Sequence, residues 1–360
     1  MLNKDSHRPV TMRDIAARLG VSGAAVSMAL RGLPGVSSET AEKVQAMARE
    51  MGWRPNPLVS AYQSQVRAGK PPRVSSAIAW ADDMRVIGAG GMEPVRTKMR
   101  LAAAAHAKAL GYTLEEIAPT GLKVNAFAKN VAIFKRIIEA RGITGLVLPI
   151  GWRVHHAVAD WSPLAIAVIG RIAGLEHSTQ PVGNPRVPHS VTSDAFSNAL
   201  LAIRKLRQAG RRRIGLALST YHIIGSNENY PAALLLEQQS WPAKERVPVL
   251  VLPKTFGPRP PEEFEAWFKK HRPDAVLCRN YEMLGWLGAL GRRVPDDVAV
   301  AHLDLGPMEP GWSGIDEREE AQAAAAVDLV IGQFGRNERD APAVPKQVLI
   351  QGAWVDGKTV

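Results

Sequence analysis

Residues 11–62 read TMRDIAARLGVSGAAVSMALRGLPGVSSETAEKVQAMAREMGWRPNPLVSAY, and this stretch decides how the chain is interpreted. Its spacing of apolar residues and glycines predicts three short helices, with a tight turn between the first two and a proline-rich exit after the third. Three features together are typical of a helix-turn-helix: two helices that cross closely over small residues, a turn at a glycine, and a second helix capped by serine. Such a motif places its second helix in a DNA groove. The competing interpretation is an ordinary helical subdomain with well-formed caps.

The first helix is predicted from its two ends. Thr11 followed three positions later by Asp14 is a capping-box pattern, so the helix should begin at Met12. Gly20 should end it, because glycine tolerates the left-handed conformation of a helix exit.

The second and third helices each follow a serine. Ser22 should cap a helix from Gly23 to about Arg31, and Ser37 a helix that runs to about Met51. Helical spacing turns one set of residues toward a small core: Val26, Leu30, Val44, Met47, Ala48 and Met51.

With these helices placed, the segment resembles the start of the LacI/GalR family of bacterial transcription regulators. The resemblance is carried by GVSGAAVSMALRG, then VSSETAEKV, then WRPNP. Ala25 replaces the family's usual Thr, Arg31 its Asn and Trp53 its Tyr. The resemblance implies a homodimeric regulator, most simply a repressor, that binds pseudo-palindromic operator DNA.

The family pattern also implies which residues meet DNA. Gly23, Ala24 and Met28 occupy the base-reading positions, and none of them can make a bidentate hydrogen bond to a base edge. Specificity should therefore rely on contacts to thymine methyl groups and on DNA shape. The residues expected at the DNA are Thr11, Ser22, Gly23, Ala24, Ser27, Met28, Arg31, Thr40, Asn56, Val59 and Tyr62.

The resemblance implies that residues 57–73 form a hinge helix and a linker. Tyr62 stands at the position that wedges into the minor groove, and Val59 at its small neighbour. Such a segment would order on DNA. The alternative is a flexible linker with no role at DNA.

Composition agrees with a nucleic-acid partner. The chain has 360 residues, a formal net charge of +11 and a pI near 9.9. Residues 1–73 hold eleven Lys/Arg and five Asp/Glu, so a fifth of the chain carries +6 of that excess. The single cysteine, Cys278, excludes a disulfide framework within the chain. Neither an apolar signal segment nor a membrane-spanning run is visible, so we expect a cytoplasmic protein without a membrane partner.

After residue 73, short apolar strands alternate with amphipathic helices, which predicts parallel doubly wound α/β sheets. The predicted strands are 76–81, 145–149, 165–169, 213–218, 247–252, 275–278 and 298–303. The predicted helices are 95–110, 131–141, 195–209, 232–239, 261–271 and 281–290.

Two long segments resemble the core of the same family, a two-lobed periplasmic-binding-protein-like fold. They are VTSDAFSNALLAIRKLRQAGRRRIGLAL and the stretch from RPDAVLCRN to ALGRRVPDDVAVAHLDL. The resemblance implies a helix-turn-helix domain at 10–56 and a core at 74–360 that binds the effector and dimerises. The first lobe would span about 74–187 and 309–339, and the second about 188–308 and 340–360.

An effector in this fold lies between the lobes, outside the carboxyl ends of the strands. The family pattern assigns Asn280 and Asp304 to it, although Tyr281 and Leu305 replace the second Asp of each pair. Tyr230 stands where sugar-binding members carry an arginine, so a sugar-clamping arginine is expected to be absent. For Asn280 and Asp304 the alternative is a capped loop.

Three further residues lie at the end of a predicted strand or soon after it, where they could line a pocket: Trp80, Asp82 and Trp152. For each tryptophan the alternative is packing in the core, which is the commoner place for this side chain.

Catalytic motifs do not accompany this layout. The sequence lacks a metal-spaced His/Cys cluster, a phosphate-binding glycine loop and a G-x-S-x-G elbow, so we expect no enzyme, cofactor or metal. The prediction is an effector-controlled DNA-binding regulator whose ligand is carbohydrate-like or another small metabolite. The alternatives are a small-molecule-binding protein without operator control and an architectural DNA-binding protein with a vestigial core.

Overall fold

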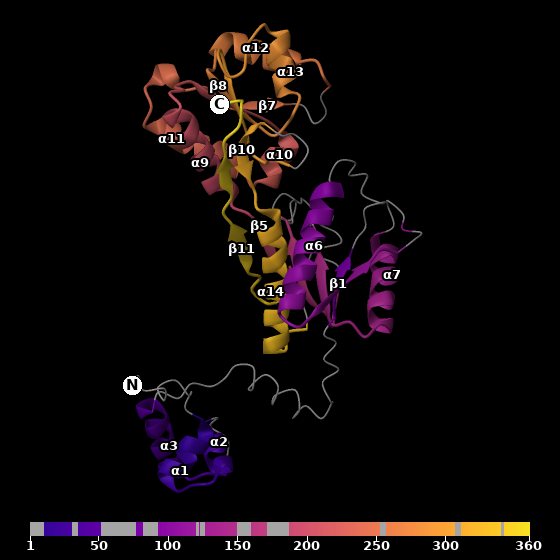
Figure 1. The fold of residues 1–360 in the computed structure, drawn as a ribbon, viewed down its shortest axis with the longest axis vertical. Helices are drawn as coiled ribbons and strands as arrows, with labels where there is room; N and C mark the ends of the chain where they lie inside the picture. The colour runs from indigo at the N-terminus through magenta and orange to yellow at the C-terminus, as the bar shows by residue number, and fades with distance from the viewer. Residues whose placement is uncertain are drawn as a thin grey trace, which may run out of the picture. The chain divides into compact units, whose positions relative to one another are not determined.

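The structure, a computed structural model, describes residues 11–30, 35–51, 77–81, 93–119, 122, 127–149, 160–170, 187–252, 257–306, 311–339 and 342–360. The chain forms two compact units, Met1–Pro72 and Arg73–Val360 (Figure 1). The finer limits expected for the hinge stay a prediction.

The N-terminal unit contains the three predicted helices, α1 (Met12–Leu19), α2 (Gly23–Leu30) and α3 (Ser38–Glu50). Gly20 ends α1 with φ of 64°, in the left-handed region that favours glycine. The small core buries Ile15, Ala16, Val26, Ala29, Val44 and Ala48. Ala29 takes the buried place in α2 that we expected for Leu30, which is only partly buried, because a short helix turns Ala29 beside Val26.

The larger unit is built on two six-stranded sheets. The first has the order β11-β5-β4-β3-β1-β2, and every pairing in it is parallel. Its strands are β1 (Ala77–Ala81), β2 (Thr113–Ile117), β3 (Gly145–Leu148), β4 (Ala165–Ile169), β5 (His189–Ser193) and β11 (Gln347–Ile350). Helices α6 (Glu93–Ala109) and α14 (Glu319–Arg336) cover one face, and α7 (Phe127–Ala140) covers the other (Figure 1).

The second sheet has the order β12-β10-β9-β8-β6-β7. Its strands are β6 (Ile214–Ser219), β7 (Leu250–Leu252), β8 (Ala275–Cys278), β9 (Ala299–His302), β10 (Ser313–Asp316) and the antiparallel edge strand β12 (Ala353–Val355). Helices α9 (Ala195–Gln208) and α11 (Asn229–Gln239) pack on one face. Helices α12 (Glu262–His271) and α13 (Met283–Ala289) pack on the other, and the short α10 (Thr220–Gly225) follows β6 directly.

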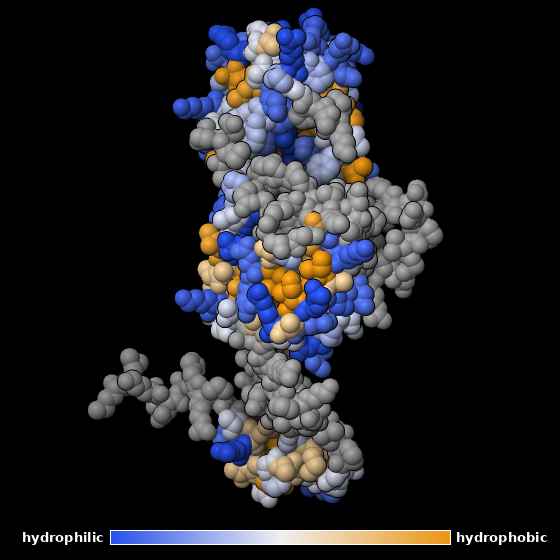
Figure 2. All heavy atoms as spheres, turned by 90° about the vertical axis from the view of Figure 1, so that its right-hand side faces the viewer, coloured by the Kyte–Doolittle hydropathy of each residue, from blue (hydrophilic) through white to orange (hydrophobic). Residues whose placement is uncertain are grey.

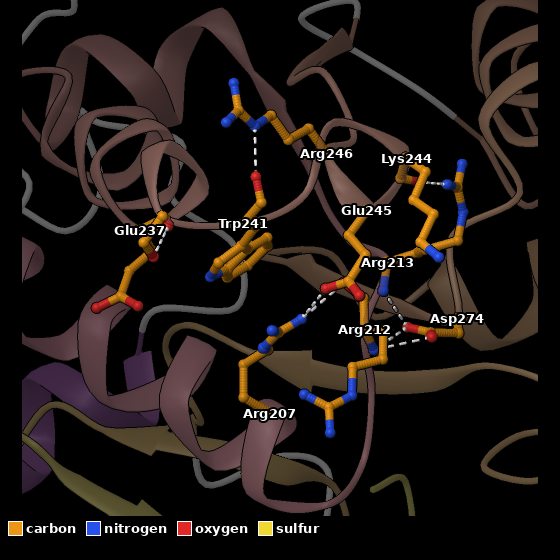
Figure 3. A network of polar contacts seen from close by, with 10 residues as sticks. Arg207, Arg212, Arg213, Glu237, Trp241, Lys244, Glu245, Arg246 and Asp274 are labelled. Atoms are coloured by element: carbon orange, nitrogen blue, oxygen red, sulfur yellow. Dashed lines mark hydrogen bonds and ion pairs between the residues drawn. The ribbon is translucent and has the colours of Figure 1, made fainter.

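The start of β6 is held by a polar network (Figure 3). Both Arg212 and Arg213 donate a backbone N–H to the Asp274 carboxylate at 2.9 Å. Arg207, near the end of α9, pairs with Glu245 at 2.7 Å and lies over the Trp241 ring, 4.5 Å from its centroid. These contacts join the end of one helix to the entry of a buried strand.

The alternating pattern predicted the doubly wound fold correctly, and all seven expected strands are present. Elements that the sequence analysis missed are short, polar or rich in small residues: β2, β5, β10, β11, β12, α10 and α14. The buried face of α14 consists of Ala323, Ala326, Val327 and Val330, whose small side chains give a weak apolar signal.

The chain passes from one sheet to the other later than we expected. Strands β5 and β11 belong to the first sheet and β10 to the second. The passages therefore fall at 193–195, 316–319 and 350–353, not near Val187, Met308 and Arg339. The chain stays in one sheet until a strand ends, and the strands that precede the three passages are β5, β10 and β11.

On the face shown in Figure 2, hydrophilic residues predominate and smaller hydrophobic groups lie between them. Four leucines are about half exposed: Leu101 on α6, Leu110 in the turn that follows α6, and Leu235 and Leu236 on α11. Among the helices that the structure describes, none is both long enough and apolar enough to cross a membrane.

Candidate functional site

The exposed side of α2 is the candidate DNA-reading surface. Ser22, Gly23 and Ala24 are exposed, and Ser27 and Met28 are half-buried, whereas Val26 and Ala29 are buried on the opposite side. Residues four apart share a face of a helix, so the expected reading positions lie together and away from the core.

The caps hold this surface in place. Thr11 and Asp14 form the predicted capping box, with the Thr11 hydroxyl donating to the Asp14 carboxylate at 2.7 Å. The Ser22 hydroxyl accepts from the Ala25 N–H at 3.1 Å at the start of α2. Thr40, half-buried, bonds the Ser37 hydroxyl at 2.8 Å in the first turn of α3. These polar groups cap the starts of all three helices, and Thr11 and Thr40 remain predicted DNA contacts.

Several predicted residues lie outside the described part of the chain. For DNA they are Arg31, Asn56, Val59 and Tyr62, together with the whole hinge, and for the effector they are Asp82 and Trp152.

The second candidate site lies at the carboxyl ends of the second sheet. Strand β6 pairs with both β7 and β8, so the strand order reverses beside β6, where open α/β sheets bind ligands. Asn280 follows β8 and Asp304 follows β9, its neighbour in the sheet. The structure thus brings the two predicted residues to one edge.

Arg279 joins these residues into a cluster. Its guanidinium pairs with the Asp304 carboxylate and donates to the Tyr230 hydroxyl at 3.3 Å. Tyr230 in turn donates to Glu317, which follows β10, at 3.1 Å. Burial lowers the pKa of Arg279, but Tyr230 and Glu317 outweigh burial, so the pKa is raised and the guanidinium stays charged.

The cluster has a buried layer and an accessible layer. Tyr230 is 1% exposed and Glu317 9%, whereas the side chains of Arg279 and Asp304 are 23% and 27% exposed. Tyr230 therefore supports Arg279 from behind, and its direct contact with an effector stays a prediction.

Asn280 is 5% exposed, and neither atom of its amide has a hydrogen-bond partner among the described residues. A buried polar group left unpaired costs about 1–3 kcal/mol. The capped-loop alternative does not describe this amide, nor the Asp304 carboxylate, which bonds Arg279 instead of nearby backbone. An amide of this kind is suited to a ligand that both donates and accepts.

Two neutral histidines lie beside the cluster. His302 stacks on Tyr281, with ring centroids 4.3 Å apart, and its Nδ1 accepts from the Asp304 N–H at 3.2 Å. Burial lowers the pKa of His302 to about 3 and that of His222 to about 4, and the charge of Arg279 adds to both shifts. Neither ring carries charge at neutral pH.

Trp80 does not lie at a pocket wall in this structure. It is fully buried between β1 and the helices α6 and α14, among Met99, Ala103 and Val327. The core-packing alternative therefore describes it, because its side chain points to the helix-covered face of the sheet. The sequence analysis also missed Arg279, Glu317 and His302. A charged residue directly before Asn280, at the end of an apolar strand, was the one visible signal.

Two family models match the chain. Residues 11–56 match "Bacterial regulatory proteins, lacI family", and residues 203–360 match "Periplasmic binding protein-like domain". The HTH-type transcriptional regulator GntR of Pseudomonas aeruginosa is 44% identical over 54 residues, which are 15% of this chain. The chain spans about a sixth (16%) of that relative's length.

Solved structures support the fold over almost the whole chain. The complex of the transcriptional regulator CelR with cellobiose is 20% identical, with a TM-score of 0.55 over 98% of this chain and 100% of that one. The Lac repressor dimer bound to operator and the anti-inducer ONPF is 18% identical, with a TM-score of 0.54 over 98% and 99%. The chain therefore joins a helix-turn-helix domain of the lacI family of bacterial regulatory proteins, at residues 11–56, to a periplasmic-binding-protein-like domain that is matched over residues 203–360.

Proposed function

We propose that this DNA-binding regulator acts as a homodimeric repressor in the bacterial cytoplasm, and that a small ligand at the carboxyl edge of the second sheet controls it. The observation that carries the proposal is the exposed face of α2 on a capped three-helix core. That face presents Gly23 and Ala24, which permit close approach to thymine methyl groups. No catalytic step belongs to this proposal.

A homodimer is supported by the leucines exposed on α6, in the turn that follows it, and on α11. Leu101, Leu110, Leu235 and Leu236 are each between 47% and 58% exposed, and such side chains suit a self-complementary contact. Two copies would present two α2 helices to two half-sites of a pseudo-palindromic operator.

The ligand site distinguishes this proposal from an architectural DNA-binding protein with a vestigial core. A vestigial site has no reason to keep the buried, unpartnered amide of Asn280 beside the Arg279–Asp304 ion pair. The helix-turn-helix distinguishes the proposal from a protein that only binds small molecules.

Footprinting of the full chain on genomic fragments tests the DNA-binding part. We expect protection of two symmetric half-sites, and diffuse, sequence-independent protection would contradict the proposal. Ala24→Glu should abolish protection because a carboxylate would face the phosphates. Ala321→Glu is the matched control, since Ala321 is an equally exposed alanine on α14.

A further inference from the structure

The formal charges of the side chains in the cluster around Arg279 do not sum to zero. Arg279 supplies one positive charge, and Asp304 and Glu317 supply two negative charges. The flanking Asp316 and Arg318 cancel each other, and the Asp316 carboxylate accepts from the Arg318 N–H at 2.8 Å. His222 and His302 add no charge at neutral pH. The described part of the site is therefore negative by one charge.

The geometry shows which charges a ligand would meet. Glu317 is buried behind Tyr230, so its charge acts at a distance. Asp304 is partly exposed, and it occupies the Nη2 side of the Arg279 guanidinium. A ligand carboxylate approaching Arg279 would therefore meet the Asp304 carboxylate beside it.

A guanidinium has five N–H donors, and the described contacts of Arg279 use its two terminal nitrogens, one toward Tyr230 and one toward Asp304. The remaining donors and the unpartnered amide of Asn280 can still bond hydroxyl or carbonyl groups. The site thus keeps its hydrogen-bonding capacity while its positive charge is already matched.

We propose that the Arg279–Asp304 ion pair determines specificity by admitting an uncharged ligand rich in hydrogen-bonding groups and excluding its anionic counterparts. The inference rests on the proposed function only in taking this edge of the sheet as the effector site. Like charges placed together without water cost enough to exclude a competitor. Sugar acids and phosphorylated metabolites should therefore be poor ligands.

Matched pairs of probes that differ in charge test this inference by calorimetry on the full chain. The pairs are D-glucose and D-glucuronate, D-galactose and D-galacturonate, and adenosine and adenosine 5′-monophosphate. We expect at least one uncharged member to bind, and its acid to bind at least about tenfold more weakly. An acid that binds as tightly as its neutral partner, or a panel in which no uncharged member binds, would overturn the inference.

Two variants locate the effect. Asp304→Asn keeps the shape and removes the charge, so the preference for the neutral member should fall at least about fivefold. Arg279→Gln should weaken the neutral member without restoring the acid, because Asp304 remains. Glu338→Gln is the control, since Glu338 is a partly exposed carboxylate that pairs with Arg336 at 2.7 Å elsewhere in the unit.

An unchanged preference in Asp304→Asn, with thermal unfolding like that of the parent, would refute the role of the ion pair. Operator footprinting with and without the bound probe separates this inference from the proposed function. A neutral ligand that binds with the expected charge preference but leaves protection unchanged would support the ion pair and contradict effector control.

Discussion

Replacing Tyr230 by Phe removes one oxygen from the centre of the ligand-site cluster and leaves the ring in place. That oxygen donates to Glu317 at 3.1 Å and accepts from Arg279 at 3.3 Å. Burial raises the pKa of Tyr230 well above its ordinary value of 10, although Arg279 opposes this effect. The hydroxyl therefore acts as a neutral donor to Glu317 throughout the ordinary pH range.

The expected cost follows from burial. Tyr230 is 1% exposed and Glu317 is 9% exposed, so water cannot replace the lost donor. A buried acceptor left unpaired costs about 1–3 kcal/mol, and bonds to charged groups lie toward the upper part of that range. The Phe ring fills the same volume, so no large cavity adds to the cost. We expect the free energy of unfolding of the larger unit to fall by about 2 kcal/mol.

Chemical denaturation, followed by tryptophan fluorescence, measures this change. Tyr221→Phe is the matched control, because Tyr221 is 70% exposed and should change stability by less than about 0.5 kcal/mol. Glu317→Gln completes a double-mutant cycle, in which the two substitutions should not be additive. A Tyr230→Phe variant as stable as the Tyr221→Phe control would refute the reasoning that this hydroxyl supports a buried charge.

Three further substitutions and one titration test other parts of the structure. Met28→Ala should weaken operator binding by about 1 kcal/mol and relax preference at one or two A·T positions; an unchanged preference in a binding-site selection would show that Met28 does not read bases. Gly314→Ala should destabilise the unit by more than about 1 kcal/mol, because a Cβ there would overlap the His302 carbonyl oxygen. Gly288→Ala, within α13 and with open space around it, should be neutral or stabilise by up to about 1 kcal/mol, so equal denaturation midpoints for the two variants would contradict the packing. The His302 ring should remain neutral at pH 5 by NMR, and a midpoint near 6.5 would contradict its burial. Because its folded pKa of about 3 lies below the unfolded value of 6.5, the contribution of this ring to the unfolding free energy should be constant above pH 6.5 and fall as pH drops toward 3.

The helix-turn-helix could be predicted closely because its signals are local. A capping box needs only Thr11 and Asp14, and a left-handed helix exit needs only Gly20. Each of these interactions joins residues no more than four apart along the chain, so the local sequence pattern is enough to predict it. Of the residues expected to face the core, Leu30, Met47 and Met51 are only partly buried, whereas Ala29 is buried. These differences reflect packing between helices, which spacing alone does not fix.

The limits of the core strands could be predicted best where a strand is buried on both faces. Strands such as β4 and β8 are continuous apolar runs and appear at their predicted limits. In contrast, β2 reads TLEEI and lies at the sheet edge, where one side remains exposed. Edge strands need no apolar run, so their pairing depends on neighbours that are distant in sequence.

The ligand site shows why a residue's position does not fix its chemistry. The family pattern placed Asn280 and Asp304 after the ends of strands, and they follow β8 and β9 in the structure; their contact with an effector stays a prediction. The pattern also implied that the arginine was missing, because Tyr230 stands in the expected place. Yet a long arginine side chain reaches the same neighbourhood from another strand, and Arg279 lies 3.3 Å from the Tyr230 hydroxyl. The pairing of that arginine with Asp304 changes what the aspartate can do, since the Oδ2 atom that bonds the cation has less capacity left to accept from a ligand. The charge preference of the site therefore depends on a contact between two strand ends 25 residues apart, which only the folded chain brings together.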